Sequence, residues 1–153
     1  MSRNSLDQLD LTILRNLSGN ARKPYLEIAR ECGVSGAAIH QRIQRLTAMG
    51  VIKGSESLID PASVGYDTCA YVGLYLSNPA QYDSVVKALE EMPEIVECHY
   101  TTGQYDILVK LYARNNEHLL HLLQKIQALG LARTETLISF RQVFKRQMYI
   151  GDE

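Results

Sequence analysis

The chain has 153 residues, of which 46% are hydrophobic, and a formal net charge of -1 at neutral pH. This length allows one domain or two small ones, and no apolar run is long enough to span a bilayer. The N-terminal stretch lacks the apolar core of a signal peptide, so we expect a cytoplasmic protein. The small net charge hides an asymmetry: residues 1–55 carry eight Lys or Arg and four Asp or Glu, and residues 56–153 carry eight and thirteen. A basic first part and an acidic second part indicate two domains with different partners.

Three helices are predicted within the first 50 residues. Apolar residues at helical spacing mark the first helix from Leu6 to Leu17, with Ser5 as its N-cap. The second helix follows Pro24 and runs to about Glu31. The third runs from about residue 36 to residue 49 and ends before Gly50.

The break between the second and third helices is typical of a helix-turn-helix. Gly33 can take the left-handed conformation that ends a helix, Val34 can fill the angle between the helices, and Ser35 can cap the third helix. Two amphipathic helices could equally belong to an ordinary helical bundle. However, no carboxylate occurs from residue 36 to residue 49. An ordinary solvated helix usually carries charges of both signs, whereas a helix that faces phosphate should avoid negative charge. We therefore expect the third helix to enter the major groove of DNA.

A boundary follows the helices. Residues 51–53 and 57–59 flank a Gly-Ser-Glu sequence, which predicts a short hairpin or a strand leading out of the helical part. Residues 60–66 contain Pro and Gly in boundary positions. We place a helix-turn-helix domain at residues 1–62 and a second domain at residues 63–153.

The second half predicts an α+β domain of the ferredoxin-like type. The predicted strands are 69–76, 95–102, 105–112 and 133–143. Asn78-Pro79 and Asn115-Asn116 open the two helices that lie between strands. The resulting order, β-α-β-β-α-β, predicts two helices on one face of a four-stranded antiparallel sheet.

The other face of this sheet is unusually apolar. In the first strand alternate residues point to opposite faces, so Ala70, Val72, Leu74 and Leu76 fit against the helices, and the remaining face carries Tyr71 and Tyr75. A tyrosine-bearing second face predicts association of two sheets in a homodimer. The alternative is that the N-terminal helices of the same chain cover this face.

The chain resembles the Lrp/AsnC family of prokaryotic transcriptional regulators, the feast-or-famine proteins, over nearly its whole length. The resemblance is carried by LDQLDLTILRNLSGNAR, by the turn GVS, by RLTAMGVIKG and by TTGQYDILVK. It implies double-stranded DNA as a partner of the head, amino acids as effectors, and dimers built through the second-domain sheets. It also implies assembly of these dimers into an octamer.

The resemblance assigns candidate DNA-binding residues to the third helix. It implies base contacts for Ala37, His40 and Gln41, and phosphate contacts for Arg42 and Arg45. The full DNA-binding set is Ser35, Ala37, His40, Gln41, Arg42, Gln44 and Arg45.

The resemblance also places an effector site near the hairpin between the second and third strands of the second domain. Gly103, Tyr105 and Asp106 match the family's motif there, and Thr134 and Thr136 match a Thr-x-Thr pattern at the start of the last strand. A glycine turn can offer backbone N–H groups to a carboxylate, and Asp106 can accept from an ammonium group. The alternatives are that Asp106 only caps its own hairpin and that the threonines are ordinary strand residues.

An enzyme is the main rival class. No Ser/His/Asp set, phosphate loop or convincing metal site is present, so we expect neither a cofactor nor a metal. The cysteines Cys32, Cys69 and Cys98 are odd in number and lack Cys-x-x-Cys spacing, so we expect buried thiols. Two alternatives stay open: a tetrapyrrole-pathway decarboxylase of similar architecture, and a nucleoid-organising DNA-binding protein without an effector.

Overall fold

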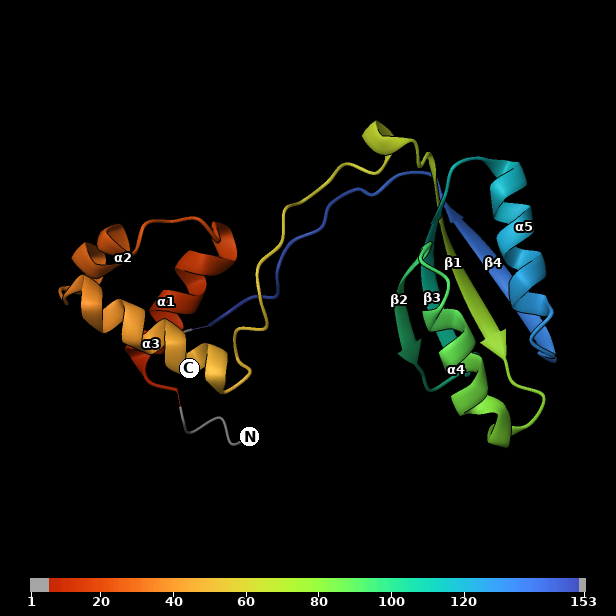
Figure 1. The fold of residues 1–153 in the computed structure, drawn as a ribbon, viewed down its shortest axis with the longest axis horizontal. Coiled ribbons are helices and arrows are strands. Elements are labelled where there is room, and N and C mark those ends of the chain that lie inside the picture. Colours follow the sequence, from red (N-terminus) through yellow and green to blue (C-terminus); the bar gives the residue numbers. More distant parts are fainter. Residues whose placement is uncertain (1–5, 152–153) are drawn as a thin grey trace. The chain divides into compact units, whose positions relative to one another are not determined.

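In the computed structural model, which describes residues 6–151, the chain divides into two compact units. One contains the residues up to Ser57 together with those from Phe144 onward, and the other is Leu58–Val143 (Figure 1). The domain junction between residues 62 and 63 stays a prediction.

The first unit contains three helices, as predicted: α1 (Gln8–Gly19), α2 (Tyr25–Cys32) and α3 (Gly36–Ala48). Their apolar faces meet around Ile13, Ile28, Ile39 and Leu46, which are fully buried. The turn between α2 and α3 is confirmed as a helix-turn-helix turn, because Gly33 has a left-handed φ of 66°.

The start of α1 differs from the prediction. Its N-cap is Asp7, whose side chain accepts a hydrogen bond from the Asp10 N–H, while the Asp10 carboxylate accepts from the Asp7 N–H. This reciprocal pair satisfies two of the N–H groups that a helix start leaves without an intrahelical partner. Ser5, the predicted cap, lies outside the described residues.

The second unit is the predicted β-α-β-β-α-β fold. Its strands are β1 (Thr68–Tyr75), β2 (Ile95–Tyr100), β3 (Ile107–Ala113) and β4 (Arg133–Ser139), and its helices are α4 (Tyr82–Glu90) and α5 (Asn116–Gln127). The strands form one sheet in the order β2-β3-β1-β4, with every pair antiparallel. Both helices cover the same face of this sheet (Figure 1).

The helix-covered face contains the core of the second unit. Ala70, Val72 and Leu74 are fully buried there, as the alternation in β1 predicted, and Leu76 packs at the edge. Val109 in β3 and Leu122 in α5 meet them. We call the face away from the helices the outer face; it carries Tyr71, Gly73 and Tyr75 of β1, Leu108, Lys110 and Tyr112 of β3, and Arg133, Glu135 and Leu137 of β4.

Three expectations about the connecting segments and thiols are wrong. No strand or hairpin forms at residues 51–59 within the described part of the chain. The last strand ends at Ser139, not Val143, because its pairing with β1 stops at the Cys69–Ser139 pair. Among the thiols, Cys98 is exposed, and Cys32 and Cys69 are only partly buried.

Candidate DNA-binding and effector sites

The outward face of α3 presents small and amide side chains. The Ser35 hydroxyl oxygen accepts a hydrogen bond from the Ala38 N–H at 3.1 Å and so caps the helix. Ile39 and Leu46 are fully buried and mark the inward side. Since an α-helix turns by roughly 100° per residue, the opposite side can be assigned directly. It holds Ala37, Gln41 and Gln44, all of which are exposed.

One flank of α3 carries an aromatic pair. His40 is exposed, and its ring lies beside the ring of Tyr25 at the start of α2, with the centroids 6.0 Å apart. Tyr25 is itself 38% exposed. The structure therefore places a histidine and a tyrosine together at the edge of the predicted DNA-binding surface, and the tyrosine was not among the candidates.

The other flank of α3 is tied to α1 through two arginines. Arg42 Nη1 lies 3.2 Å from the Asp10 carboxylate and also pairs with Asp7. Arg45 Nη1 lies 3.4 Å from the other Asp10 oxygen. Asp10 is fully buried, so these guanidinium groups compensate a charge that has left water. We call Asp7, Asp10, Arg42 and Arg45 the arginine clamp.

The clamp gives the two arginines a partner other than phosphate. Arg42 lowers the pKa of Asp7 chiefly through its side-chain hydrogen bond, and the same contacts raise the pKa of Arg42. Arg45 retains 47% side-chain exposure, so it is more available to a ligand than Arg42, which retains 32%. Sequence spacing could not reveal this arrangement, because more than 30 residues separate Asp10 from these arginines.

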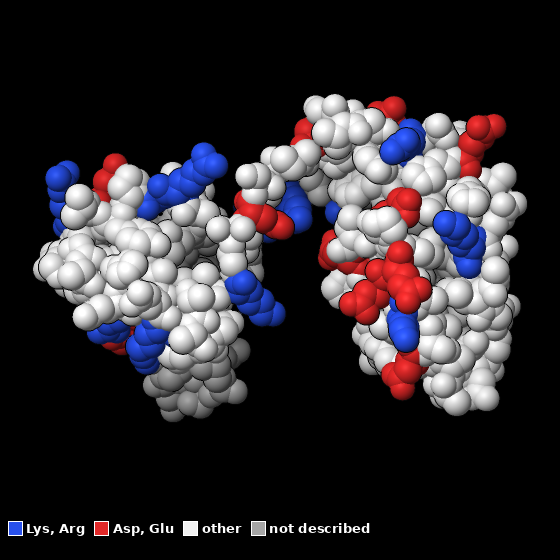
Figure 2. Space-filling model, in the orientation of Figure 1, with Lys and Arg blue, Asp and Glu red and all other residues white. Residues whose placement is uncertain are grey.

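The charge asymmetry of the sequence is visible on the surface. Figure 2 shows Lys and Arg scattered over the helical unit, whereas Asp and Glu gather on the second unit. Arg22, Arg30 and Lys53 are exposed cations of the helical unit. They add to Arg45 as groups that can meet a polyanion.

Three of the five predicted effector residues lie in one anchored hairpin loop. Gly103 has a left-handed φ of 94°, which favours glycine. The Asp106 N–H donates to the Leu74 carbonyl at 3.0 Å, and the Asp106 Oδ2 accepts from the Leu76 N–H at 2.8 Å. One carboxylate oxygen of Asp106 is therefore already engaged with the end of β1.

The two predicted threonines lie elsewhere in the subunit. Thr134 and Thr136 pair with Leu74 and Val72 and share the helix-covered side of β4. The Thr134 hydroxyl accepts from Gln127 Nε2 at 3.4 Å. The Tyr105 ring lies on the outer face, against Gly73, so one subunit does not place the side chains of all five residues on one face.

Glu135, which the sequence excluded, lies on the side of Tyr105. Burial and a hydrogen bond with Glu135 raise the pKa of Tyr105. Arg133 lies above the Tyr75 ring, with its guanidinium carbon 4.8 Å from the centroid. The Tyr75 hydroxyl and one Glu135 oxygen are buried without a hydrogen-bond partner. Alternation along β4 places Glu135 on the face opposite Thr134 and Thr136. The strand register is also needed to place Glu135 beside Tyr105.

The outer face also contains a buried lysine. Lys110 is 6% exposed and lies between the rings of Tyr71 and Tyr112, with its Nζ 5.9 and 5.5 Å from their centroids. Its Nζ is 3.9 Å from a Glu97 carboxylate oxygen. Burial lowers the pKa of Lys110, but its neighbours, Tyr112 foremost, outweigh burial and the net shift is upward.

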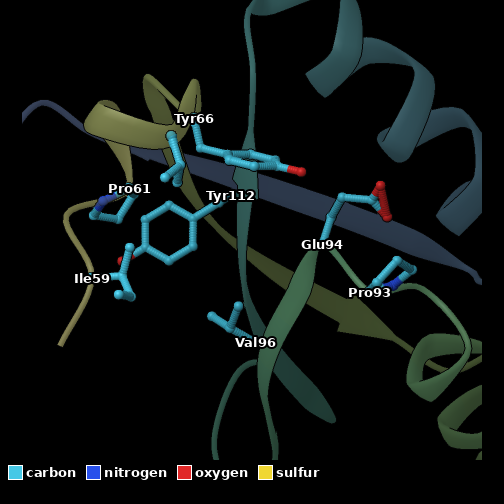
Figure 3. Close-up of a pocket in the computed structure, with 8 residues that line it drawn as sticks. Ile59, Pro61, Tyr66, Pro93, Glu94, Val96 and Tyr112 are labelled. Atoms are coloured by element: carbon cyan, nitrogen blue, oxygen red, sulfur yellow. The ribbon is translucent and has the colours of Figure 1, made fainter. Parts of the chain in front are cut away.

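A cavity of about 300 Å³ opens in the second unit (Figure 3). It is lined by Ile59, Pro61, Val64, Tyr66, Pro93, Glu94, Val96 and Tyr112. The Glu94 carboxylate already faces His118 Nε2 at 3.4 Å, while the His118 Nδ1 accepts from the Arg114 N–H. The cavity therefore offers mainly apolar and aromatic walls, which suit an apolar group.

Within residues 6–151, no group of three His, Cys, Asp or Glu side chains could hold a metal ion. In the same part of the chain, no helix is both long enough and apolar enough to cross a membrane.

Comparison with known proteins matches both units. Residues 6–47 match the AsnC-type helix-turn-helix domain, and residues 69–149 match the Lrp/AsnC ligand binding domain. The regulatory protein AsnC of Haemophilus influenzae is 40% identical over 146 residues, covering 94% of this chain and 97% of the relative. The regulator Ptr1 of Methanocaldococcus jannaschii is 41% identical over 114 residues, covering 74% and 76%.

Solved structures agree with this assignment. The structure of Escherichia coli AsnC has a TM-score of 0.87 at 37% identity and covers 94% of this chain and 97% of its own. A feast or famine regulatory protein of M. tuberculosis, complexed with L-methionine, has a TM-score of 0.90 at 27% identity and covers 96% and 100%. The helix-turn-helix and the ferredoxin-like unit thus occur together, in this order, along nearly the full length of relatives. The chain belongs to the Lrp/AsnC family of transcriptional regulators.

Proposed function

We propose that the chain is a sequence-specific DNA-binding transcriptional regulator that responds to an amino acid and acts in the cytoplasm. The observation that carries the DNA-binding part is the outward face of α3. This face lacks carboxylates and presents Ala37, Gln41 and Gln44 within an AsnC-type helix-turn-helix.

The outward side chains suit base edges in the major groove. A glutamine amide can bond to adenine at two positions, and an alanine methyl can contact the methyl group of thymine. Ser35 and His40 flank this surface, and the exposed cations Arg22, Arg30 and Lys53 supply further phosphate contacts. Arg45 shares in phosphate binding, whereas Arg42 acts mainly within the arginine clamp.

The effector site lies at the hairpin loop of the second unit. The M. tuberculosis relative carries L-methionine, which supports a zwitterionic amino acid as the ligand here. The remaining acceptor capacity of Asp106 suits an ammonium group. Because Thr134 and Thr136 lie on the face of the sheet opposite the Tyr105 ring, they belong to the wall that a neighbouring subunit completes.

The functional unit is a homodimer that joins through the outer face and assembles further to an octamer. Leu137 of the outer face is 48% exposed, and Val96 of β2, which lines the cavity beside Tyr112, is 51% exposed. A second copy would cover them, together with the apolar cavity beside Tyr66 and Tyr112. The Lys110–Glu97 pair would then be buried as a pair, which limits the penalty of removing the lysine from water.

The test of DNA recognition compares two exposed glutamines. Gln41→Ala should change the sequence preference of the chain and weaken its preferred site by about 1–3 kcal/mol, because base contacts carry discrimination. Gln124→Ala, at an exposed position of α5, is the matched control and should leave DNA binding unchanged. Selection from a random duplex library, followed by titration of the selected site, gives both quantities. An unaltered preference in the Gln41 variant would place base recognition outside this face.

A further inference from the structure

Strand β1 contains a glycine in its middle. A glycine there weakens a strand, and it often marks a place where another group packs closely against the backbone. Gly73 lies on the outer face, paired with Leu108 on one side and Glu135 on the other. It is buried, although this face carries no helix. What covers Gly73 is the ring of Tyr105 from the hairpin loop.

The contact between Gly73 and Tyr105 leaves no room for a side chain. A β-carbon added at Gly73 would lie 2.6 Å from the Tyr105 Cγ and 2.5 Å from its Cε1, separations that real β-carbons do not show. The Cγ atom belongs to the base of the ring, so a small rotation of the side chain would not relieve the overlap. The backbone φ of Gly73 is not positive, so the requirement for glycine at this position comes from the Tyr105 ring and not from the backbone conformation.

The ring is also held at its other edges. It meets the Tyr75 ring edge-on, with the centroids 5.5 Å apart. Burial, followed by the Glu135 carboxylate of β4, raises the pKa of Tyr105. Tyr105 therefore lies over β1 and contacts two of its residues, Gly73 and Tyr75.

Tyr105 is directly adjacent to the residues proposed to meet the effector. The Thr101 hydroxyl donates to the Tyr105 carbonyl at 2.9 Å, and Asp106 follows with its two contacts to the end of β1. The ring contact and the Asp106 contacts both tie the loop to β1 and the residue that follows it. Loss of the ring contact would leave only hydrogen bonds to hold Gly103 and Asp106 in place.

We propose that Gly73 is a positioning residue for effector binding: it admits the Tyr105 ring, and the ring holds the hairpin loop in the conformation that binds the amino acid. This role rests on the proposed effector function. Gly73 does not touch the ligand, and it acts through the position of Tyr105. A protein that populates the binding-competent loop in about a tenth of its molecules binds about tenfold more weakly.

The experiment is a double-substitution cycle in the full-length chain with Gly73→Ala, Tyr105→Ala and the two combined. L-methionine is the first probe, and the other common L-amino acids follow one at a time by calorimetry. Gly19→Ala is the matched control, because a β-carbon at Gly19 meets nothing within 4 Å. Amide hydrogen exchange of residues 101–106 reports the order of the loop without any ligand.

Gly73→Ala should weaken amino-acid binding at least about tenfold and speed loop exchange, while Gly19→Ala changes neither. The combined variant should be no worse than Tyr105→Ala alone, because the added methyl then meets no ring. If Gly73→Ala fails to fold, the combined variant should fold again, and its failure to do so would overturn the proposal. Affinity and exchange equal to those of the unaltered chain would also overturn it. If the unaltered chain binds none of the amino acids, the proposed effector function fails, and the role of Gly73 in binding fails with it.

Discussion

At the scale of single residues, the arginine clamp changes how the third helix is interpreted. A run without carboxylates suggested that Arg42 and Arg45 face phosphate, yet the compensating carboxylates lie in α1. Asp10 has no exposure and would be an unpaired buried charge without them. The clamp therefore holds α3 against α1. A cation on this helix can stabilise the fold without contacting DNA.

Arg42→Ala should destabilise the helical unit more than it alters DNA contacts. Losing a partner of a buried charge costs about 3–5 kcal/mol, and an exposed pair contributes less than about 1 kcal/mol, so the half-buried clamp should lie between these values. Urea unfolding measures this loss, and the salt dependence of DNA binding should keep its slope. Arg30→Ala, at an exposed position of α2, is the control for stability. A slope reduced by about one unit in the Arg42 variant would assign this arginine to phosphate.

The clamp also predicts how stability changes with pH. Arg42 lowers the pKa of Asp7 below its ordinary value of 3.8. A carboxylate with a lowered pKa stabilises the folded state above its unfolded pKa, and this contribution is lost as the pH falls through the folded value. The unaltered chain should therefore lose stability below about pH 4 more steeply than Arg42→Ala does. Parallel acid profiles would contradict the pairing.

At the scale of elements, the hairpin loop depends on one carboxylate with two possible roles. Asp106→Asn separates them, because an amide oxygen still accepts from the Leu76 N–H but carries no charge for an ammonium group. We expect the loop to keep its order and the amino acid to bind more weakly by about 1.5–3 kcal/mol, the range of a hydrogen bond to a charged group. Calorimetry with L-methionine and the other common amino acids measures this. Undiminished affinity would mean that Asp106 only caps its hairpin.

Local patterns predicted most of this fold from the sequence. Periodicity placed the helices and strands, and Gly33 and Ser35 marked the helix-turn-helix, because each signal lies within a few neighbouring residues. The misses depend on distant partners. The end of β4 depends on its pairing with β1, which stops at Ser139, and the contact between Tyr105 and Gly73 depends on the strand register. Such contacts leave no trace in the spacing of adjacent residues.

The candidate sites divide in the same way. The outward face of α3 follows from helical geometry alone, so the sequence was sufficient to predict that it carries Ala37, Gln41 and Gln44. The sequence could not predict that Arg42 pairs with Asp10 or that Glu135 lies near Tyr105, because each pair joins segments more than 25 residues apart in the chain. The DNA-binding and effector assignments remain proposals in both cases.

At the scale of the whole molecule, the outer face determines whether the chain acts alone. Two leucines offer a matched comparison: Leu137 on the outer face is 48% exposed, and Leu120 on α5 is 57% exposed. A glutamate at either position remains in contact with water in a single subunit, so neither change should unfold it. Only at Leu137 would association of two outer faces force the new charge out of water.

Leu137→Glu should therefore run as a monomer at micromolar concentration, while Leu120→Glu and the unaltered chain remain dimers or larger. Sedimentation velocity measures the states, and circular dichroism checks that both variants keep their helix and strand content. The monomer should also bind its operator much more weakly, because a dimer engages two half-sites and the second contact is intramolecular. A Leu137→Glu protein that still dimerises, or an unaltered chain that is monomeric, would contradict pairing through this sheet. In the first case Phe140, which follows β4 and is fully exposed, would be the next residue to test.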